Sequence, residues 1–206
     1  MKKNIIITGG LGYIGSELCK IYSGVSWFHK ITVIDNRFIS ERVNELRNWN
    51  IDFVHGDILD KELMRKYCQN ADIIHHLAGI TDVPRTKSES SLEKDKLIKL
   101  VAEEGTQNIL NVISKNCKII VPSTHVVYEG IEQVKNNISE NEDLKPVLSY
   151  ASSKAINEKQ LKDSGKNYII LRLGSIYGYS TDTARIDIMP NLFSKIASQN
   201  GTIKLF

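Results

Sequence analysis

The stretch TGGLGYIG, residues 8–15, decides the fold of this 206-residue chain. It joins a β-branched run, NIIIT at residues 4–8, to residues 14–23, whose pattern predicts a helix. Glycines at positions 9, 12 and 15 permit a tight turn, a close approach of the backbone to a phosphate and close helix–strand packing. The N-terminus of the helix adds unpaired N–H groups and a positive dipole. The stretch therefore predicts a turn that binds a dinucleotide; the alternative is a glycine-rich turn without a ligand.

Apolar runs and helical patterns alternate along the rest of the chain. Strands are predicted at residues 30–35, 51–55, 71–76, 117–122 and 168–173, and helices at 41–48, 61–67, 92–115, 150–163 and 189–199. Runs that are apolar throughout suit strands covered on both faces, as in a parallel sheet flanked by helices. The sequence therefore predicts an α/β fold with a doubly wound parallel sheet, the Rossmann fold. Residues 130–146 have no clear period, and we expect a long loop that could border the active site.

The charge and composition disfavour several classes of partner. The formal net charge is +3, and basic residues are interleaved with acidic ones, so nucleic acid is not an expected partner. No apolar run is long enough to span a bilayer, so no membrane contact is expected. The first residues show no signal-peptide pattern, and a cytoplasmic location is the expectation.

The cysteines and the adjacent histidines do not form a recognisable metal or disulfide pattern. Cys19, Cys68 and Cys117 are too far apart for CxxC chemistry, and an odd number argues against a disulfide framework. We expect reduced, partly buried thiols. His75 and His76 lack partners at metal-ligand spacing, so strand-end packing is predicted for them and no metal is expected.

Asp35 closes the second predicted strand, about 20 residues after the last glycine of the turn. A carboxylate there can accept hydrogen bonds from both ribose hydroxyls of an adenosine, and it would repel a 2′-phosphate. Arg37 lies nearby and could attract such a phosphate, but the repulsion of the phosphate by Asp35 at the strand tip should be the stronger effect. The sequence therefore favours NAD over NADP. Asp57, just past the third strand, could cap a helix.

Tyr150 and Lys154 stand four residues apart in SYASSKA, residues 149–155. Residues with this spacing share one face of a helix, and such pairs are common on ordinary solvated helices. The same spacing would also suit a general acid/base and the cation that tunes it. Spacing alone leaves both interpretations open.

With TGGLGYIG, HLAG at 76–79, PSTHVVY at 122–128 and YASSK at 150–154 in order, the chain resembles a known family. It is similar to the extended short-chain dehydrogenases/reductases of the NAD-dependent epimerase/dehydratase family, which act on nucleotide sugars. The resemblance runs from residue 1 to the end. Four motifs in the family's order are far more specific than any one of them alone.

The resemblance implies that NAD is the cofactor, and it assigns residues to each part of the dinucleotide. The pyrophosphate would be lined by Gly9, Gly12, Tyr13, Ile14 and Gly15. The adenosine ribose would be held by Asp35 and Asn36, and the adenine by Asp57 and Ile58. The middle of the dinucleotide would be contacted by Leu77, Ala78 and Gly79.

The resemblance also implies the catalytic residues Thr124, Tyr150 and Lys154. Tyr150 would take the proton from a sugar hydroxyl while the carbon beneath delivers hydride to NAD, and Thr124 would orient the same oxygen. Lys154 would supply the cation that lowers the pKa of Tyr150, and it would also form a hydrogen bond with the nicotinamide ribose. The resemblance places both Tyr150 and Lys154 in contact with the cofactor. Ser123 is adjacent to Thr124, and a threonine at a strand end can simply turn the backbone.

The segment HVVYEG, which follows Thr124, departs from the 4,6-dehydratases of the family. It lacks their Asp-Glu pair, which serves as acid and base in water elimination, so dehydration is disfavoured. Epimerisation, or oxidation and reduction, of a nucleotide sugar remains the expected function. A non-catalytic NAD-binding module that senses the cofactor or holds a partner is the alternative.

The resemblance divides the chain into residues 1–175, a NAD-binding Rossmann domain, and residues 176–206, the start of a smaller substrate-binding domain. This second part is expected to hold the helix at 189–199 and a final strand. Family members usually continue well beyond such a point, so we expect either a fragment of a longer enzyme or a shortened member. The family is commonly dimeric, which predicts a homodimer through the helices at 92–115 and 150–163.

Overall fold

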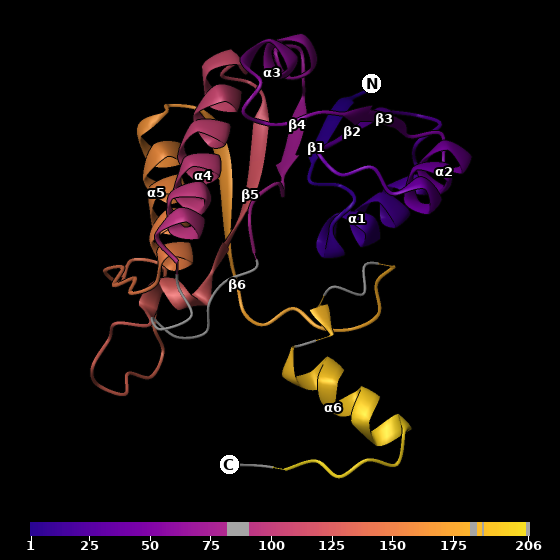
Figure 1. The fold of residues 1–206 in the computed structure, drawn as a ribbon. Coiled ribbons are helices and arrows are strands. Elements are labelled where there is room, and N and C mark those ends of the chain that lie inside the picture. The colour runs from indigo at the N-terminus through magenta and orange to yellow at the C-terminus, as the bar shows by residue number, and fades with distance from the viewer. Residues whose placement is uncertain (82–90, 182–184, 187, 205–206) are drawn as a thin grey trace.

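The structure is a computed structural model that describes residues 1–81, 91–181, 185–186 and 188–204. These residues form a six-stranded sheet in the order β3-β2-β1-β4-β5-β6, and every neighbouring pair is parallel. The strands are β1 (Asn4–Thr8), β2 (Lys30–Asp35), β3 (Asp52–His55), β4 (Ile73–His76), β5 (Lys118–Thr124) and β6 (Asn167–Leu173). The predicted doubly wound parallel sheet is confirmed (Figure 1).

Helices lie on both faces of the sheet, as Figure 1 shows for α1 and α2 on one side and α4 and α5 on the other. The helices are α1 (Tyr13–Ser23), α2 (Ser40–Asn48), α3 (Lys61–Cys68), α4 (Leu92–Val112), α5 (Ser149–Asp163) and α6 (Met189–Ser198), with a short 3₁₀ helix, η2 (His125–Tyr128). Successive residues of a strand point to opposite faces. Accordingly Ile5 and Ile7 of β1 pack in one core with α1 and α2, and Ile6 packs in a second core with α3, α4 and α5.

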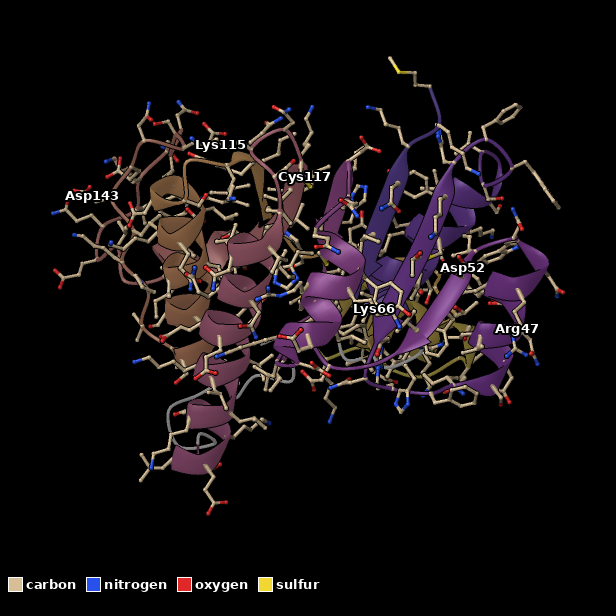
Figure 2. All side chains as sticks on the ribbon, turned by 90° about the horizontal axis from the view of Figure 1, so that it is seen from above. Arg47, Asp52, Lys66, Lys115, Cys117 and Asp143 are labelled. Atoms are coloured by element: carbon tan, nitrogen blue, oxygen red, sulfur yellow. The ribbon has the colours of Figure 1, made fainter. Side chains whose placement is uncertain are left out.

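The largest difference from the predicted helix boundaries is at the end of α4, which stops at Val112 rather than at residue 115. Ile113 is already extended, with φ −74° and ψ 150°. The hydroxyl oxygen of Ser114 then accepts a bond from the Cys117 N–H at 3.1 Å, which turns the chain into β5. Figure 2 labels Lys115 and Cys117 on this connection. A serine that bonds the backbone locally competes with helix continuation, which explains the early end.

Residues 130–146 contain no helix or strand, as predicted. The loop is attached at its base, where the Gly130 N–H donates to the Lys145 oxygen and the Lys145 N–H donates to the Val127 oxygen, both at 2.8 Å. Figure 2 labels Asp143 in this loop, beside α5. The loop therefore connects η2 to α5, next to the carboxyl end of β5.

Helix α6 lies away from the sheet and hangs below it in Figure 1. No residue of α6 is buried. The final strand that the sequence predicted is not present in residues 201–204, which have no regular structure; residues 205–206 lie outside the described part. A strand needs a neighbour to bond its N–H and C=O groups, and here the chain has turned away from the edge strand β6.

The order of the sheet reverses between β1 and β4, because the chain runs outward through β2 and β3 and returns to the other side of β1. The carboxyl ends of these strands define the switch point at which open α/β sheets bind their ligands. The glycine-rich turn, residues 76–79 and the end of β5 all lie at this edge.

Candidate active site

The glycine-rich turn has the backbone geometry that the sequence predicted. Gly9 adopts φ +71°, and a Cβ at this position would lie 2.6 Å from the nitrogen of Ala78. A Cβ on Gly15 would collide with the carbonyl oxygen of Gly9. Gly12 is the N-cap residue of α1, whose first turn holds no acidic side chain. The turn therefore leaves the N-terminus of α1 suited to an anion.

Asp35 lies directly beside this turn, with its side chain buried. One carboxylate oxygen accepts a bond of 2.9 Å from the Leu11 N–H. The other accepts the Arg37 N–H at 3.0 Å and pairs with Arg37 Nε at 3.4 Å. The end of β2 is thus bonded to the turn. The charge of Asp35 is partly balanced by Arg37, a contact that the sequence did not predict.

Asn36 and Asp57, which the resemblance assigned to ribose and adenine, are brought together by a bond of 3.0 Å from the Asn36 amide to the Asp57 carboxylate. The second Asp57 oxygen accepts from the Leu59 N–H. Asp57 does not cap α3: that position is taken by Asp60, which accepts from the N–H groups of the first turn.

Ile58 lies in the core, with its side chain against Gly105 and its oxygen accepting from Asn108. The side chain and the carbonyl oxygen of Ile58 are therefore both occupied by contacts within the protein.

The residues after β4 continue alongside β1. The Leu77 N–H donates to the Thr8 oxygen at 3.0 Å, and the Ala78 N–H donates to the Thr8 hydroxyl at 3.4 Å. Gly79 is exposed, with open space where a Cβ would stand. Leu77 and Ala78 form the wall against which Gly9 packs, so the structure brings the HLAG motif and the glycine-rich turn into contact.

The side chains of Tyr13 and Ile14 make different contacts. The Tyr13 hydroxyl donates to the oxygen of Gly178 at 2.5 Å, so the phenol is directed toward the C-terminal segment. Ile14 is 37% exposed and lines a shallow pocket with Leu18 and Tyr177. For both residues, a contact with the pyrophosphate would therefore come from the main chain.

Tyr150 and Lys154 lie near the start of α5, next to the end of β5. The Lys154 ammonium donates to the main-chain oxygen of Pro122 at 3.0 Å and lies 5.8 Å from the centre of the Tyr150 ring. Thr124 is buried at the end of β5, where its hydroxyl oxygen accepts the Val126 N–H at 3.4 Å. The structure therefore gathers the three predicted catalytic side chains at one strand end.

Burial shifts the pKa values of both Tyr150 and Lys154. Burial raises the pKa of the Tyr150 phenol, and the charge that opposes this rise is that of Arg185. Burial lowers the pKa of Lys154 to about 8. For Tyr150 the effect of burial is the larger one, because removing the phenolate from water costs more than the charge of Arg185 returns.

Ser123 and Thr124 are adjacent in sequence, but their hydroxyl groups have different hydrogen-bond partners. The Ser123 hydroxyl donates to Glu158 at 2.6 Å, and Glu158, only 2% exposed, pairs with Arg172 at 2.6 Å. Successive residues of β5 point to opposite faces, so Thr124 points away from this ion pair. Burial acts to raise the pKa of Glu158, but bonds from Arg172 and Ser123 outweigh it and lower the pKa.

A chain of buried hydrogen bonds near Lys154 was not predicted from the sequence. His76 lies buried with Nδ1 2.8 Å from the Thr8 hydroxyl and Nε2 3.1 Å from the Thr106 hydroxyl. Burial, with the charge of Lys154, lowers its pKa to about 3. Asn157 of α5 donates to the same Thr106 oxygen at 3.0 Å. This chain of bonds joins β1, β4, α4 and α5 beneath Lys154, and it depends on residues too far apart in sequence to form a recognisable motif.

His75 contacts Tyr22 at 2.7 Å, which agrees with the predicted strand-end packing of the two histidines. All three cysteines are free and buried. Burial raises the pKa of Cys19 and Cys68 to about 12, so these thiols are unreactive. Among the described residues, no group of three or more His, Cys, Asp or Glu side chains has a metal-binding arrangement.

Glu129, the acidic residue of HVVYEG, is committed to a structural role. One of its carboxylate oxygens accepts the N–H groups of Val147 and Leu148 at 2.7 Å each. These residues immediately precede α5, so Glu129 satisfies donors at the start of the helix that carries Tyr150.

A family model for the NAD dependent epimerase/dehydratase family matches residues 5–206. The chain belongs to this family. Among curated proteins, the chain is similar to the UDP-N-acetyl-alpha-D-glucosaminuronate decarboxylase of Bacillus cytotoxicus, with 38% identity over 132 residues, which cover 62% of this chain and 38% of that protein. The dTDP-D-glucose 4,6-dehydratase of Dictyostelium discoideum is 30% identical over 197 residues, covering 85% of this chain and 44% of the relative. The chain thus spans less than half the length of these two relatives.

Solved structures of epimerases in the NAD dependent epimerase/dehydratase family have the same fold. The UDP-N-acetylglucosamine 4-epimerase from Methanobrevibacter ruminantium M1, in complex with UDP-N-acetylmuramic acid, has a TM-score of 0.76 at 26% identity, over 97% of this chain and 64% of that one. The UDP-glucuronic acid 4-epimerase from Bacillus cereus, in complex with NAD, has a TM-score of 0.75 at 25% identity, over 98% and 63%. NAD is therefore the cofactor of the family, as the glycine-rich turn and Asp35 predicted.

Within the described residues, no helix has the length and apolar character needed to cross a membrane.

Proposed function

We propose that this chain is the NAD-binding and proton-transferring part of a nucleotide-sugar epimerase or oxidoreductase. The observation that carries the proposal is the position of Thr124, Tyr150 and Lys154 at the end of β5, on the same edge of the sheet as the glycine-rich turn. Sites in doubly wound sheets form at this edge. A titratable phenol beside an ammonium can serve as the acid or base in a proton transfer to or from a hydroxyl.

The residues at the turn fit a dinucleotide. Gly9 and Gly15 leave no room for side chains between the turn and its neighbours, so the backbone itself faces the ligand. The hydroxyl of Ser16, in the first turn of α1, is buried and has no hydrogen-bond partner among the described residues. A buried hydroxyl without a partner is costly, and a phosphate oxygen would satisfy it. When bound, NAD supplies the acceptor and donor of hydride.

Tyr150 would exchange the proton of a sugar hydroxyl at its phenol oxygen. Because its pKa is raised in the structure, the phenol carries its proton at neutral pH and can act first as an acid. Acting as a base requires further positive charge close to the ring. Among the residues that the structure describes, Lys154 and Arg185 bring positive charge to the ring, and the Thr124 hydroxyl would orient the reacting oxygen.

Dehydration remains the less favoured reaction, although a relative is a dehydratase. Thr124 is followed by His125 and Val126 instead of an acidic pair, and Glu129 is occupied by the start of α5. An alternative function is a NAD-binding module without turnover. The raised pKa of Tyr150 favours it, because a phenol that holds its proton tightly is a weak base.

The wider assignments are part of the same proposal. Residues 1–175 form the NAD-binding domain, and 176–206 begin a domain that contacts the nucleotide sugar. Two chains associate through α4 and α5, which lie side by side (Figure 1) and leave Leu97 and Leu100 of α4 49% and 41% exposed. The compartment is the cytoplasm.

The test of the proposed function combines binding and turnover. Calorimetry with NAD is expected to show binding to this chain, and a panel of nucleotide sugars on the longest natural chain is expected to give an epimer or a change in NADH absorbance. Binding of NAD without turnover of any sugar would favour the non-catalytic module. No binding of NAD would overturn both functions.

A further inference from the structure

The segment at residues 178–181 lies against the glycine-rich turn, although the two are far apart in sequence. The hydroxyl of Tyr13 donates to the oxygen of Gly178 at 2.5 Å. The hydroxyl of Ser180, a residue only 7% exposed, donates to the main-chain oxygen of Tyr13 at 2.9 Å. Tyr13 therefore contacts this segment with both its side chain and its backbone.

Asn191 of α6 completes a closed set of hydrogen bonds. Its amide nitrogen donates to the Tyr13 hydroxyl at 3.1 Å, and its amide oxygen accepts the Gly178 N–H at 2.9 Å. The roles are consistent, because the Tyr13 hydroxyl donates once and accepts once. The three residues join the first turn of α1 to the first turn of α6.

A second connection starts on the other side of Gly12. One guanidinium nitrogen of Arg42, from α2, donates to the oxygen of Leu11, and another donates to the oxygen of Thr181 at 3.2 Å. The N–H of the same Leu11 donates to Asp35. The two residues that flank Gly12 are therefore both bonded to the segment, one directly and one through Arg42.

These contacts are the main support that the described structure gives to α6. No residue of the helix is fully buried, and its apolar residues Phe193 and Ile196 are only partly covered, so little apolar burial holds it in place. Its orientation relative to the sheet depends on a few polar bonds, each of which contributes about 1 kcal/mol. Because so few bonds hold α6, a small displacement of Tyr13 in the glycine-rich turn would change the position of the helix.

We propose that Tyr13 is a positioning residue that couples binding of the dinucleotide to the placement of residues 178–181 and α6. A pyrophosphate bound at the N-terminus of α1 holds the main chain of residues 12–15 in one geometry. That geometry places the Tyr13 hydroxyl and oxygen for Gly178, Asn191 and Ser180. Coupling between two sites is reciprocal, so fixing the segment also strengthens binding of NAD. The inference rests on the proposed function only in requiring that NAD binds.

Hydrogen–deuterium exchange of peptides from residues 176–198, with and without saturating NAD, tests the coupling. In the unmodified chain, NAD is expected to slow exchange in these peptides by about fivefold, the lower end of typical coupling. Tyr13→Phe removes only the hydroxyl; it is expected to abolish most of the slowing and to raise the dissociation constant of NAD by up to the same factor. Tyr168→Phe, at an exposed tyrosine of β6 outside the segment, is the matched control and should leave both the slowing and the dissociation constant unchanged.

Asn191→Ala provides a second variant outside the core, and it should reproduce the effect of Tyr13→Phe. Two results would overturn the coupling while leaving the proposed function intact: NAD binds but does not slow exchange in residues 176–198, or the slowing is the same in the unmodified chain and in both variants. Failure of the unmodified chain to bind NAD would instead overturn the proposed function together with the coupling.

Discussion

The ammonium group of Lys154 and the main-chain oxygen of Pro122 lie 3.0 Å apart, which joins α5 to β5 two residues before Thr124. The bond gives the buried charge one partner, but it does not replace the water that the ammonium loses. The pKa of Lys154 therefore falls from 10.5 to about 8. A lysine in this state can change its charge close to physiological pH, and this has a consequence for stability.

Below pH 8 both the folded and the unfolded chain carry the Lys154 proton, and the folded chain bears the full cost of the buried charge. Between pH 8 and 10.5 the unfolded chain binds more protons, so the free energy of unfolding rises with pH. Lys154→Met removes this dependence. We expect the stability of the variant relative to the unmodified chain to fall by about 2 kcal/mol between pH 7 and pH 9.5. Urea unfolding at both pH values measures it, and a difference independent of pH would show that Lys154 is not buried as a charge.

Tyr150→Phe should separate chemistry from cofactor binding in the longest natural form of the chain. The change removes the proton-transferring oxygen and leaves the ring, so turnover of the nucleotide sugar should fall by about 10²–10⁴ while NAD affinity stays nearly constant. Tyr168→Phe, in β6, is the matched control. Steady-state kinetics and calorimetry provide the two measurements. Unchanged turnover in Tyr150→Phe would show that another group transfers the proton.

Asp35 and Arg37 should act in opposite directions on cofactor choice. NAD is expected to bind at least about tenfold more tightly than NADP, or ~1.4 kcal/mol, because Asp35 repels a 2′-phosphate. Asp35→Ala should narrow this difference. Arg37→Ala should widen it, since the cation paired with Asp35 is lost. Calorimetric titration of both cofactors into each variant tests the pair, and equal affinities in the unmodified chain would contradict the assigned role of Asp35.

Gly9→Ala should prevent the turn from forming. A non-glycine residue at φ +71° costs about 1–3 kcal/mol, and the new Cβ would also meet the Ala78 nitrogen at 2.6 Å. Gly165→Ala is the control, because Gly165 has φ +64° but open space at its Cβ. Thermal unfolding and NAD titration should show loss of stability in both variants but loss of NAD binding only in Gly9→Ala. Normal NAD affinity in Gly9→Ala would argue against this turn as the phosphate site.

The Glu158–Arg172 ion pair should be the most sensitive of the buried polar contacts. Glu158→Gln leaves the partly buried Arg172 guanidinium without its charge partner, which should lower the free energy of unfolding by about 2 kcal/mol at pH 7. The folded-state pKa of Glu158 is lowered from 4.5, so its contribution is complete above pH 4.5 and is lost as pH falls through the folded value. The variant and the unmodified chain should therefore converge in acid. Lys159→Ala, which breaks an exposed pair with Asp163, is the control and should have no measurable effect in urea unfolding.

Local features of the sequence were sufficient to predict the fold, the glycine-rich turn and the shared helix face of Tyr150 and Lys154. Strands covered on both faces must be apolar throughout, so their positions were recognisable, and the glycine-rich turn could be recognised because few other residues tolerate its geometry. The spacing of Tyr150 and Lys154 predicted a shared helix face correctly. The helix boundary at Val112 was misjudged because Ser114 bonds the backbone of Cys117, a local alternative that the apolar pattern does not contain.

The sequence by itself determined the order of strands and helices along the chain and the place of the glycine-rich turn, and its motifs supplied the candidates for proton transfer. Only the tertiary structure decided that Ser123, and not Thr124, is bonded to Glu158, a residue on another element. It also decided that the pKa of Tyr150 is raised and that the Tyr13 phenol bonds the segment leading to α6. Burial and long-range hydrogen bonds set these properties, and both arise from residues that become neighbours only when the chain folds.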